Sequence, residues 1–591
     1  MLYNHKFNTS MRFKLGISIG LFLVSTALSF AQEDKEEQGD IDTERLIIVK
    51  PYSPTVSDAF KIKQNPVIND STERQKKKVN YTINSFPVAS TFTPAKGRAA
   101  RVQQQALPTS FDNYASLGVG NYFNVDAAFF GRIPLSRYQD LNLSFTHQST
   151  QGGIDGVDLD DEFYDTQLKL GYEQETRSFT WGTQINALHQ SFNWYGLPQE
   201  FSIPEPLLDG IETGHAYLGG GLDAYLNTGE GVFQGIDLSY MRFADNWGAG
   251  ENRLVLTPKF ELPLTQMPVD LELKFDYVNG NFDEQPNNVS FMPKYAYLNS
   301  SISPRIVLSD QDYSVQLGAE LVYSMDVENE KNNFYIYPKV SGSYRLAGDY
   351  FTVYGGAQGG LKQNSYYGFT QNNPFVAPAL VVAPTDKQYD VFVGGKGKFT
   401  EALSYNVKAS YQNEVNKALF KHSTDNQNVT SREGYEYFNS FGVVYDEVNT
   451  LQLFAELQLD INDQFNLKLN GSFYSYGEDR EPEAWNLPQF ESQLMLNYAI
   501  DQKWLISASM LAMGERKDSL FIINSTPESS AQTQTLDAFI DANLRVDYQF
   551  TEQWGFFLRG NNLLGDNYER WYAYPTQGLQ IMAGATYQFD W

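Results

Sequence analysis

One stretch of the 591-residue chain carries enough carboxylates to bind a metal ion. In GGIDGVDLDDEF, five acidic residues fall close together: Asp155, Asp158, Asp160, Asp161 and Glu162. Clustered carboxylate oxygens are ligands that Ca²⁺ accepts, although this stretch lacks the ligand order and the closing Glu spacing of an EF-hand loop. The pattern predicts either a calcium site or a solvated acidic loop.

Residue types that carry catalysis are present, but no motif organises them. The chain has no Cys, which excludes thiol catalysis, zinc–thiolate sites and disulfides. No histidine stands at ligand spacing from a second one, and the five are His5, His147, His189, His215 and His422. No GxSxG motif marks a nucleophile. We therefore expect no enzymatic activity and no cofactor apart from the possible calcium.

Two aromatic stretches, NWYGLPQEF at 193–201 and NSYYGFTQNNPF at 364–375, offer another kind of chemistry. Tyr, Trp and Pro side chains in such stretches form contact surfaces for sugars or peptides. The alternative is that they pack neighbouring loops together.

The first 31 residues predict an exported protein. Met11, Arg12 and Lys14 precede an apolar run at 15–28, and small residues follow, with cleavage expected after Ala31. A membrane helix is the alternative, but the run is short for a span of ~20 residues. The leader contains Lys6, Arg12 and Lys14, so its removal leaves 41 of the 44 basic residues against 71 acidic ones. The resulting net charge of −30 argues against nucleic acid as a partner.

The stretch 451–473, LQLFAELQLDINDQFNLKLNGSF, shows the repeating element of the chain. Leu and Ile occupy alternate positions opposite Gln, Glu and Asp, and after a short break the alternation resumes. Because side chains alternate faces along a strand, this is a hairpin with one apolar and one polar wall. A soluble sandwich buries the apolar wall, whereas a membrane barrel exposes it to lipid.

The lengths of the connections decide between these folds. From residue 112 onward, short connections alternate with long polar or glycine-rich ones, the signature of an outer-membrane barrel with short periplasmic turns and long extracellular loops. We predict an all-β fold, a transmembrane antiparallel β-barrel of about 22 strands over 112–591, with 436–461 as one long strand. The Leu wall then faces lipid and the Gln and Glu wall faces a lumen.

The last strand, QIMAGATYQFDW, ends the chain on aromatic side chains. Tyr587, Phe589 and Trp591 share its apolar face. A terminal strand of this kind resembles the signal read by the barrel-assembly machinery, which we expect to be a partner, together with outer-membrane lipid and lipopolysaccharide.

The C-terminal region resembles the end of TonB-dependent receptors, in which an Asn-Leu-Leu-Asp-Tyr segment precedes a Tyr-Pro-Gly loop and the closing strand. The matching residues are Asn562, Leu563, Leu564, Asp566, Tyr568, Tyr574, Pro575 and Gly578. GVVYDEVNT at 442–450 looks like an upper-strand segment of Bacteroidota-type members. The resemblance covers roughly 112–591.

Residues 32–111 depart from that family, whose members carry a folded plug domain of well over a hundred residues. This segment has only 80 residues and no recognisable plug motif, so we expect a periplasmic segment that is extended or partly lumenal. Its stretch TERLIIVKPY resembles a TonB-contact box that pairs by strand addition, through Glu44, Arg45, Leu46, Ile47, Ile48 and Val49. The alternative is a tethering or partner-binding strand. Because a barrel this wide needs a filled lumen, residues 85–111, the long loops or a partner must close it.

Two functions follow from this resemblance. The first is a structural or accessory subunit of an outer-membrane multiprotein complex, with surface lipoproteins or other outer-membrane subunits as partners. The alternative is a TonB-dependent or passive transporter for nutrient uptake, with residues 32–111 as a non-standard plug.

Overall fold

The computed structural model describes residues 111–198, 208–264, 267–285, 292–423, 433–462, 464–501, 503–522 and 530–591. All of them belong to one compact unit, Gln64–Trp591. The predicted signal peptide, residues 1–31, and the segment 32–110, which includes the stretch 44–49, lie outside the described residues.

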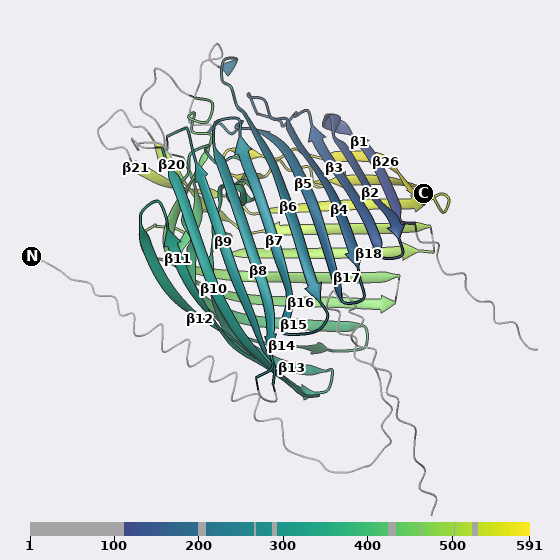
Figure 1. The fold of residues 1–591 in the computed structure, drawn as a ribbon. Helices are drawn as coiled ribbons and strands as arrows, with labels where there is room; N and C mark the ends of the chain where they lie inside the picture. The colour runs from purple at the N-terminus through teal and green to yellow at the C-terminus, as the bar shows by residue number, and fades with distance from the viewer. Residues whose placement is uncertain are drawn as a thin grey trace, which may run out of the picture. The chain divides into compact units, whose positions relative to one another are not determined.

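The described part of the chain forms one 22-stranded antiparallel sheet (Figure 1). Its first half consists of β1 (Asn113–Gly120), β2 (Val125–Ser136), β3 (Gln139–Thr150), β4 (Phe163–Glu175), β5 (Phe179–Asn193), β6 (Gly214–Thr228), β7 (Phe233–Asp245), β8 (Gly250–Leu262), β9 (Val269–Asn281), β10 (Lys294–Ser309) and β11 (Tyr313–Asp326). Its second half consists of β12 (Lys331–Ala347), β13 (Phe351–Lys362), β14 (Thr385–Lys398), β15 (Leu403–His422), β16 (Phe441–Asn462), β17 (Phe465–Glu478), β18 (Phe490–Ile500), β19 (Trp504–Met513), β22 (Phe539–Gln549), β23 (Trp554–Asn561) and β26 (Gln580–Phe589).

The sheet closes on itself because β1 pairs with both β2 and β26. Asn113 lies opposite Phe589 in this seam, and the backbone N–H of Asp112 donates to Asp590 Oδ1 at 2.8 Å. The predicted closed barrel of 22 strands is confirmed, and so is the single long strand expected at 436–461, which is β16.

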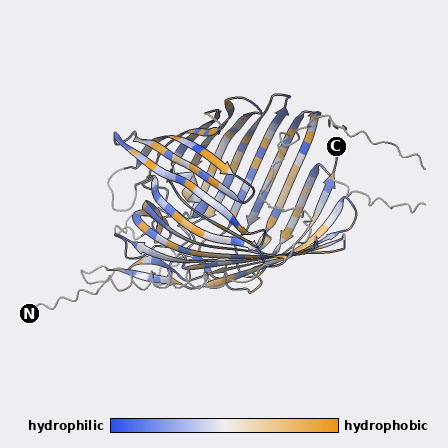
Figure 2. Ribbon diagram, turned by 90° about the horizontal axis from the view of Figure 1, so that it is seen from below, coloured by the Kyte–Doolittle hydropathy of each residue, from blue (hydrophilic) through white to orange (hydrophobic). Residues whose placement is uncertain are grey.

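The hairpin of β16 and β17 shows which wall faces outward. Leu453 and Leu457 are 52% and 42% exposed, whereas Gln452 and Glu456 on the other face are half-buried. On the inner face, Lys468 Nζ lies 2.8 Å from Glu456 Oε2. The same alternation of apolar and polar residues follows the strands around the barrel (Figure 2). The apolar wall therefore faces outward and the polar wall lines the lumen, as predicted.

The two rims of the barrel differ in their connections. One rim, here the short-turn rim, carries turns such as 137–138, 176–178 and 463–464. The other, the long-loop rim, carries 151–162, 194–213, 363–384 and 423–440. The separation predicted from the sequence is incomplete, because the long-loop rim also has short connections at 121–124, which holds the 3₁₀ turn η2 (Asn121–Phe123), at 246–249 and at 327–330.

Besides η2, three small elements of the described residues stand outside the barrel sheet, all in connections of the long-loop rim. They are the helix α3 (Tyr366–Asn372), the hairpin of β20 (Arg516–Ile522) with β21 (Ser530–Leu536), and the pair β24 (Glu569–Trp571) and β25 (Tyr574–Pro575). The helix was not predicted, since its seven residues are too few to display a helical stripe. Within the described ranges, no helix has the length and apolar character needed to span a membrane.

Candidate functional site

The connection between β13 and β14, residues 363–384, folds into the barrel interior. It starts with α3, whose N-cap Ser365 accepts a hydrogen bond from the backbone N–H of Gly368 through its Oγ at 3.0 Å. Tyr366 and Phe369 of the helix are buried, and so are Val376 and Leu380 after it. The apolar side chains of this loop therefore form a core instead of meeting water.

A carboxylate of the barrel wall holds the first turn of this helix. Glu251, near the start of β8, is 2% exposed, and its Oε2 accepts hydrogen bonds from the backbone N–H of Tyr366 at 2.6 Å and from the hydroxyl of Tyr295 at 2.5 Å. The N–H groups of a first helical turn have no partner within the helix. A carboxylate satisfies them and also suits the positive end of the helix dipole.

A second carboxylate holds the Tyr366 side chain. The Tyr366 hydroxyl donates to Asp245 Oδ2 at 2.6 Å, and His215 Nε2 lies 3.0 Å from the same oxygen. The Tyr217 hydroxyl lies 2.9 Å both from His215 Nδ1 and from the carbonyl oxygen of Pro374. Burial, together with the Asp245 charge, raises the pKa of the Tyr366 phenol well above its ordinary value, so the phenol stays a donor.

This network could not be found by the spacing of histidines. Histidine spacing tests only for a zinc site, and the sequence gives no sign that His215 meets Tyr366, 151 residues away. The sequence did offer one sign of this network, which is the position of two acidic residues. Asp245 and Glu251 flank an unusually short connection of the long-loop rim, where acidic side chains can reach a loop folded inward.

The inward loop connects opposite sides of the barrel. A single hydrophobic cluster contains Tyr217, Phe243, Val278 and Tyr295 from β6 to β10, Tyr366, Phe369, Val376 and Leu380 from the loop, Phe441 from β16, and Tyr574 from the connection 562–579. Strands pair in chain order, so β7 and β16 stand nearly opposite each other in a ring of 22. These walls share one cluster because residues 363–384 cross the lumen between them.

The closing motif of the sequence fixes the other side of this cluster. Tyr574 is 1% exposed and stacks on Phe375 with ring centroids 3.8 Å apart. Its hydroxyl donates to the carbonyl of Asn439. Asn562 Nδ2 donates to the carbonyl oxygens of Asp566 at 2.7 Å and Gln577 at 2.9 Å, which folds the connection back on itself.

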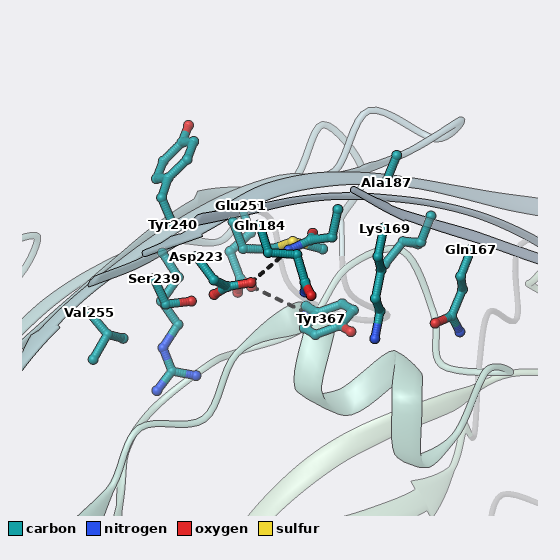
Figure 3. Close-up of a pocket in the computed structure, with 14 residues that line it drawn as sticks. Gln167, Lys169, Gln184, Ala187, Asp223, Ser239, Tyr240, Glu251, Val255 and Tyr367 are labelled. Carbon is teal, nitrogen blue, oxygen red and sulfur yellow. Dashed lines mark hydrogen bonds between the residues drawn. The ribbon is translucent and has the colours of Figure 1, made fainter. Parts of the chain in front are cut away.

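Beside α3 the loop leaves a polar cavity of about 360 Å³ against the wall formed by β4 to β8. Polar side chains of the wall point toward the helix, while Tyr240 and Ala187 point to the opposite face of the sheet (Figure 3). The polar lining residues are Gln167, Lys169, Gln184, Asn186, Asp223, Ser239, Glu251, Arg253 and Tyr367. This is the candidate functional site, because it is a concave surface with converging polar groups inside the barrel.

The predicted acidic loop folds without gathering its carboxylates around one point. Asp161 accepts hydrogen bonds from the backbone N–H groups of Gly153 at 3.0 Å and Ile154 at 2.6 Å, so it shapes the turn of its own loop. Among the described residues, no group of three or more His, Cys, Asp or Glu side chains is arranged to hold a metal ion. Calcium binding by Asp155, Asp158, Asp160, Asp161 and Glu162 stays a prediction.

The aromatic stretches mainly pack the loops together. Trp194 and Tyr366 are fully buried, and Trp194 lies against Tyr435 with ring centroids 5.5 Å apart. Tyr367 differs, since it is half-buried and lines the polar cavity. At the chain end, Tyr587 and Phe589 stack at 5.4 Å, and recognition of this strand by the assembly machinery stays a prediction.

Comparison with known proteins identifies the barrel. No family model and no curated protein matches the chain. The siderophore receptor PirA from Acinetobacter baumannii matches with a TM-score of 0.59 and 12% identity, over 82% of this chain and 81% of that one. The pyoverdine outer membrane receptor FpvA from Pseudomonas aeruginosa PAO1 matches with 0.59 and 12%, over 82% and 79%. The ferric-catecholate import receptor Fiu from Escherichia coli K12 matches with 0.58 and 10%, over 82% of each chain.

At this level of identity the likeness concerns the fold. The chain has the closed 22-stranded antiparallel barrel of outer-membrane receptors, as the resemblance to TonB-dependent receptors implied.

Proposed function

We propose that this protein is an outer-membrane uptake barrel that admits small polar solutes through its lumen. One observation carries the proposal: a closed barrel with the fold of siderophore receptors has a polar inner wall and a polar cavity beside a loop that crosses the lumen. This favours the transporter alternative over the accessory subunit predicted from the sequence.

The inner wall supports passage of solutes. Ion pairs occur along it, as in Arg253 with Asp276 at 2.7 Å and Lys339 with Glu320 at 2.9 Å. Such charged groups keep the wall polar and hydrated, which suits transit of polar molecules.

In the energised form of this function, the N-terminal stretch 44–49 would link uptake to its energy source. We propose that this stretch adds as a strand to TonB or to a partner. Ile47→Pro removes a backbone N–H and opposes strand pairing, so it should abolish energised uptake while the barrel still assembles and migrates in a heat-modifiable way on gels.

The test of the function compares two preparations. Intact cells with and without the protein are assayed for uptake of a panel of labelled polar solutes, in the presence and absence of a protonophore. Proteoliposomes containing the purified protein are assayed for swelling with the same panel. Protein-dependent entry in either assay supports the proposal, and protonophore sensitivity identifies the energised form.

The accessory role predicts the opposite pattern. In that case deletion of the gene changes no uptake rate, while surface lipoproteins or other outer-membrane subunits that co-purify with this chain leave their complex. That outcome would overturn the uptake proposal.

A further inference from the structure

The cavity beside α3 contains hydrogen-bond donors that no part of the described chain satisfies. The side chains of Lys169, Gln184, Ser239 and Tyr367 line it, and none of them has a hydrogen bond or ion pair with another described residue. They come from β4, β5, β7 and α3, so four separate elements aim unpaired donors at one space. A pocket built this way recognises a ligand rich in acceptor atoms.

The same cavity offers an acceptor. Asp223 Oδ2 accepts a hydrogen bond from Asn186 Nδ2 at 2.9 Å, while Oδ1 has no partner among the described residues. Figure 3 shows Asp223 between Gln184 and Ser239, pointing toward Tyr367. The ligand must therefore donate as well as accept, and a hydroxyl group does both through one atom.

The charges in the cavity favour a neutral ligand over a strongly charged one. Lys169 and Arg253 line it together with Asp223 and Glu251, so groups of both signs are present. Arg253 also holds Asp276 through two hydrogen bonds, at 2.9 and 2.7 Å. An anion would meet the two carboxylates, and a cation would meet the two basic groups.

An aromatic ring completes the lining. Tyr367 packs edge-on against Phe243 with ring centroids 5.1 Å apart, which fixes its position beside the amides and the carboxylate. A fixed ring gives an apolar platform next to polar groups.

We infer that this cavity binds a neutral, hydroxyl-rich solute, a sugar or a short oligosaccharide. The inference deepens the proposed uptake function and rests on it for the role of the site in transport. It assigns Asp223 and Gln184 to hydroxyl recognition and Tyr367 to contact with the apolar face of a sugar ring.

The shape of the inner wall favours an oligomer. A second cavity of about 400 Å³ shares Gln184, Asp223, Ser239 and Val255 with the first, so the two form one trough along the wall. The second adds further groups of the same chemistry, which are Asn142, Glu173, Tyr225, Asp237 and Thr257. A chain of sugar units can lie along this trough.

The experiment measures binding to the purified full-length protein in detergent, by saturation-transfer NMR with three probes: maltotriose, citrate and triglycine. We expect saturation transfer to maltotriose alone. Asp223→Asn and Gln184→Ala should each weaken its binding about tenfold, as loss of a hydrogen bond to a ligand does. Tyr367→Phe, which keeps the ring, should bind more tightly than Tyr367→Ala.

Glu272→Gln is the matched control, because Glu272 is an acidic residue of the inner wall that lines a different cavity. It should bind maltotriose like the unaltered protein. Binding of citrate or triglycine without maltotriose, or equal loss in Asp223→Asn and Glu272→Gln, would overturn the inference.

The two proposals fail in different ways. If the uptake assays show protein-dependent entry of other solutes but maltotriose does not bind, the sugar assignment is wrong and the uptake function stands. If maltotriose binds in an Asp223-dependent manner but no solute enters cells or proteoliposomes, the site stands and the uptake function is wrong.

Discussion

Glu251 of the barrel wall accepts a hydrogen bond from the backbone N–H of Tyr366 at 2.6 Å, although 115 residues separate them in the chain. This bond ties a strand of the wall to the first turn of a helix inside the lumen. The position of the helix is thus set by a buried carboxylate of the wall as well as by its own connection. Replacing this carboxylate should therefore weaken the attachment of residues 363–384 to the barrel wall.

Replacing Glu251 by Ala should loosen the inward loop. The substitution leaves the buried N–H of Tyr366 and the hydroxyl of Tyr295 without their acceptor, and hydrogen bonds to a charged group contribute roughly 1.5–3 kcal/mol each. Hydrogen exchange of residues 363–384 should accelerate, and conductance in planar bilayers should rise. Glu272→Gln serves as control, and unchanged exchange in α3 would contradict the role given to Glu251.

The two faces of the β16–β17 hairpin should respond differently to charge. Leu457 and Leu469 lie opposite each other on the outer face, while Gln458 faces the lumen. Leu457→Arg or Leu469→Arg should cost roughly 2–4 kcal/mol if the site lies at mid-membrane, whereas Gln458→Arg should be tolerated. Denaturant unfolding in lipid vesicles measures the difference, and equal effects would show that the walls are assigned wrongly.

The β20–β21 hairpin should be less stable at neutral than at acidic pH. Asp518 of β20 is fully buried, and burial raises its pKa to about 6, although it accepts hydrogen bonds from the backbone N–H groups of His422 and Ser519. Because the folded pKa lies above the ordinary value, this contribution to stability is complete below about pH 4 and is lost as the pH rises through about 6. The difference corresponds to roughly 3 kcal/mol.

Hydrogen exchange in β20 and β21, corrected for intrinsic rates, should therefore increase between pH 4 and pH 7. Asp518→Asn has no titrating group and should remove this dependence. The same pH profile in both proteins would rule out Asp518 as its source.

Tyr574 should hold the connection 562–579 against the loop 363–384 that crosses the lumen. Tyr574→Ala removes a buried ring that stacks on Phe375, a kind of change that costs roughly 3–5 kcal/mol in a packed core. Limited proteolysis should then cut near residues 375 and 439 while the barrel strands stay intact. Tyr574→Phe keeps the stack and loses only the hydrogen bond to Asn439, so it should be cut far less.

The barrel was predictable from the sequence because neighbouring residues within each strand reveal which of its faces is apolar. Alternation with a period of two identified each strand, and the two faces of β16 and β17 followed directly from Leu453, Gln452 and their neighbours. The interior was not predictable in this way. The contacts of Tyr366 with Asp245 and Glu251 span more than a hundred residues, and no short-range pattern encodes them.

The loop residues also gave a mixed signal. The aromatic side chains of NSYYGFTQNNPF predicted either loop packing or a binding surface. The structure divides these roles between adjacent residues, with Tyr366 in the core and Tyr367 in the cavity. The two tyrosines differ only in the direction in which each side chain leaves α3. That direction depends on how the helix is positioned by its contacts with the barrel wall.

The seam between β1 and β26 has a consequence for assembly. Asn113 donates from Nδ2 to the carbonyl oxygen of Phe589, a contact that spans 476 residues. Contacts between residues so far apart in the sequence form late, after the strands between them have paired. Until then both seam strands carry unpaired backbone edges, which a hydrocarbon phase does not tolerate. A chain that stops before residue 580 is thus an open sheet with two reactive borders instead of a smaller barrel.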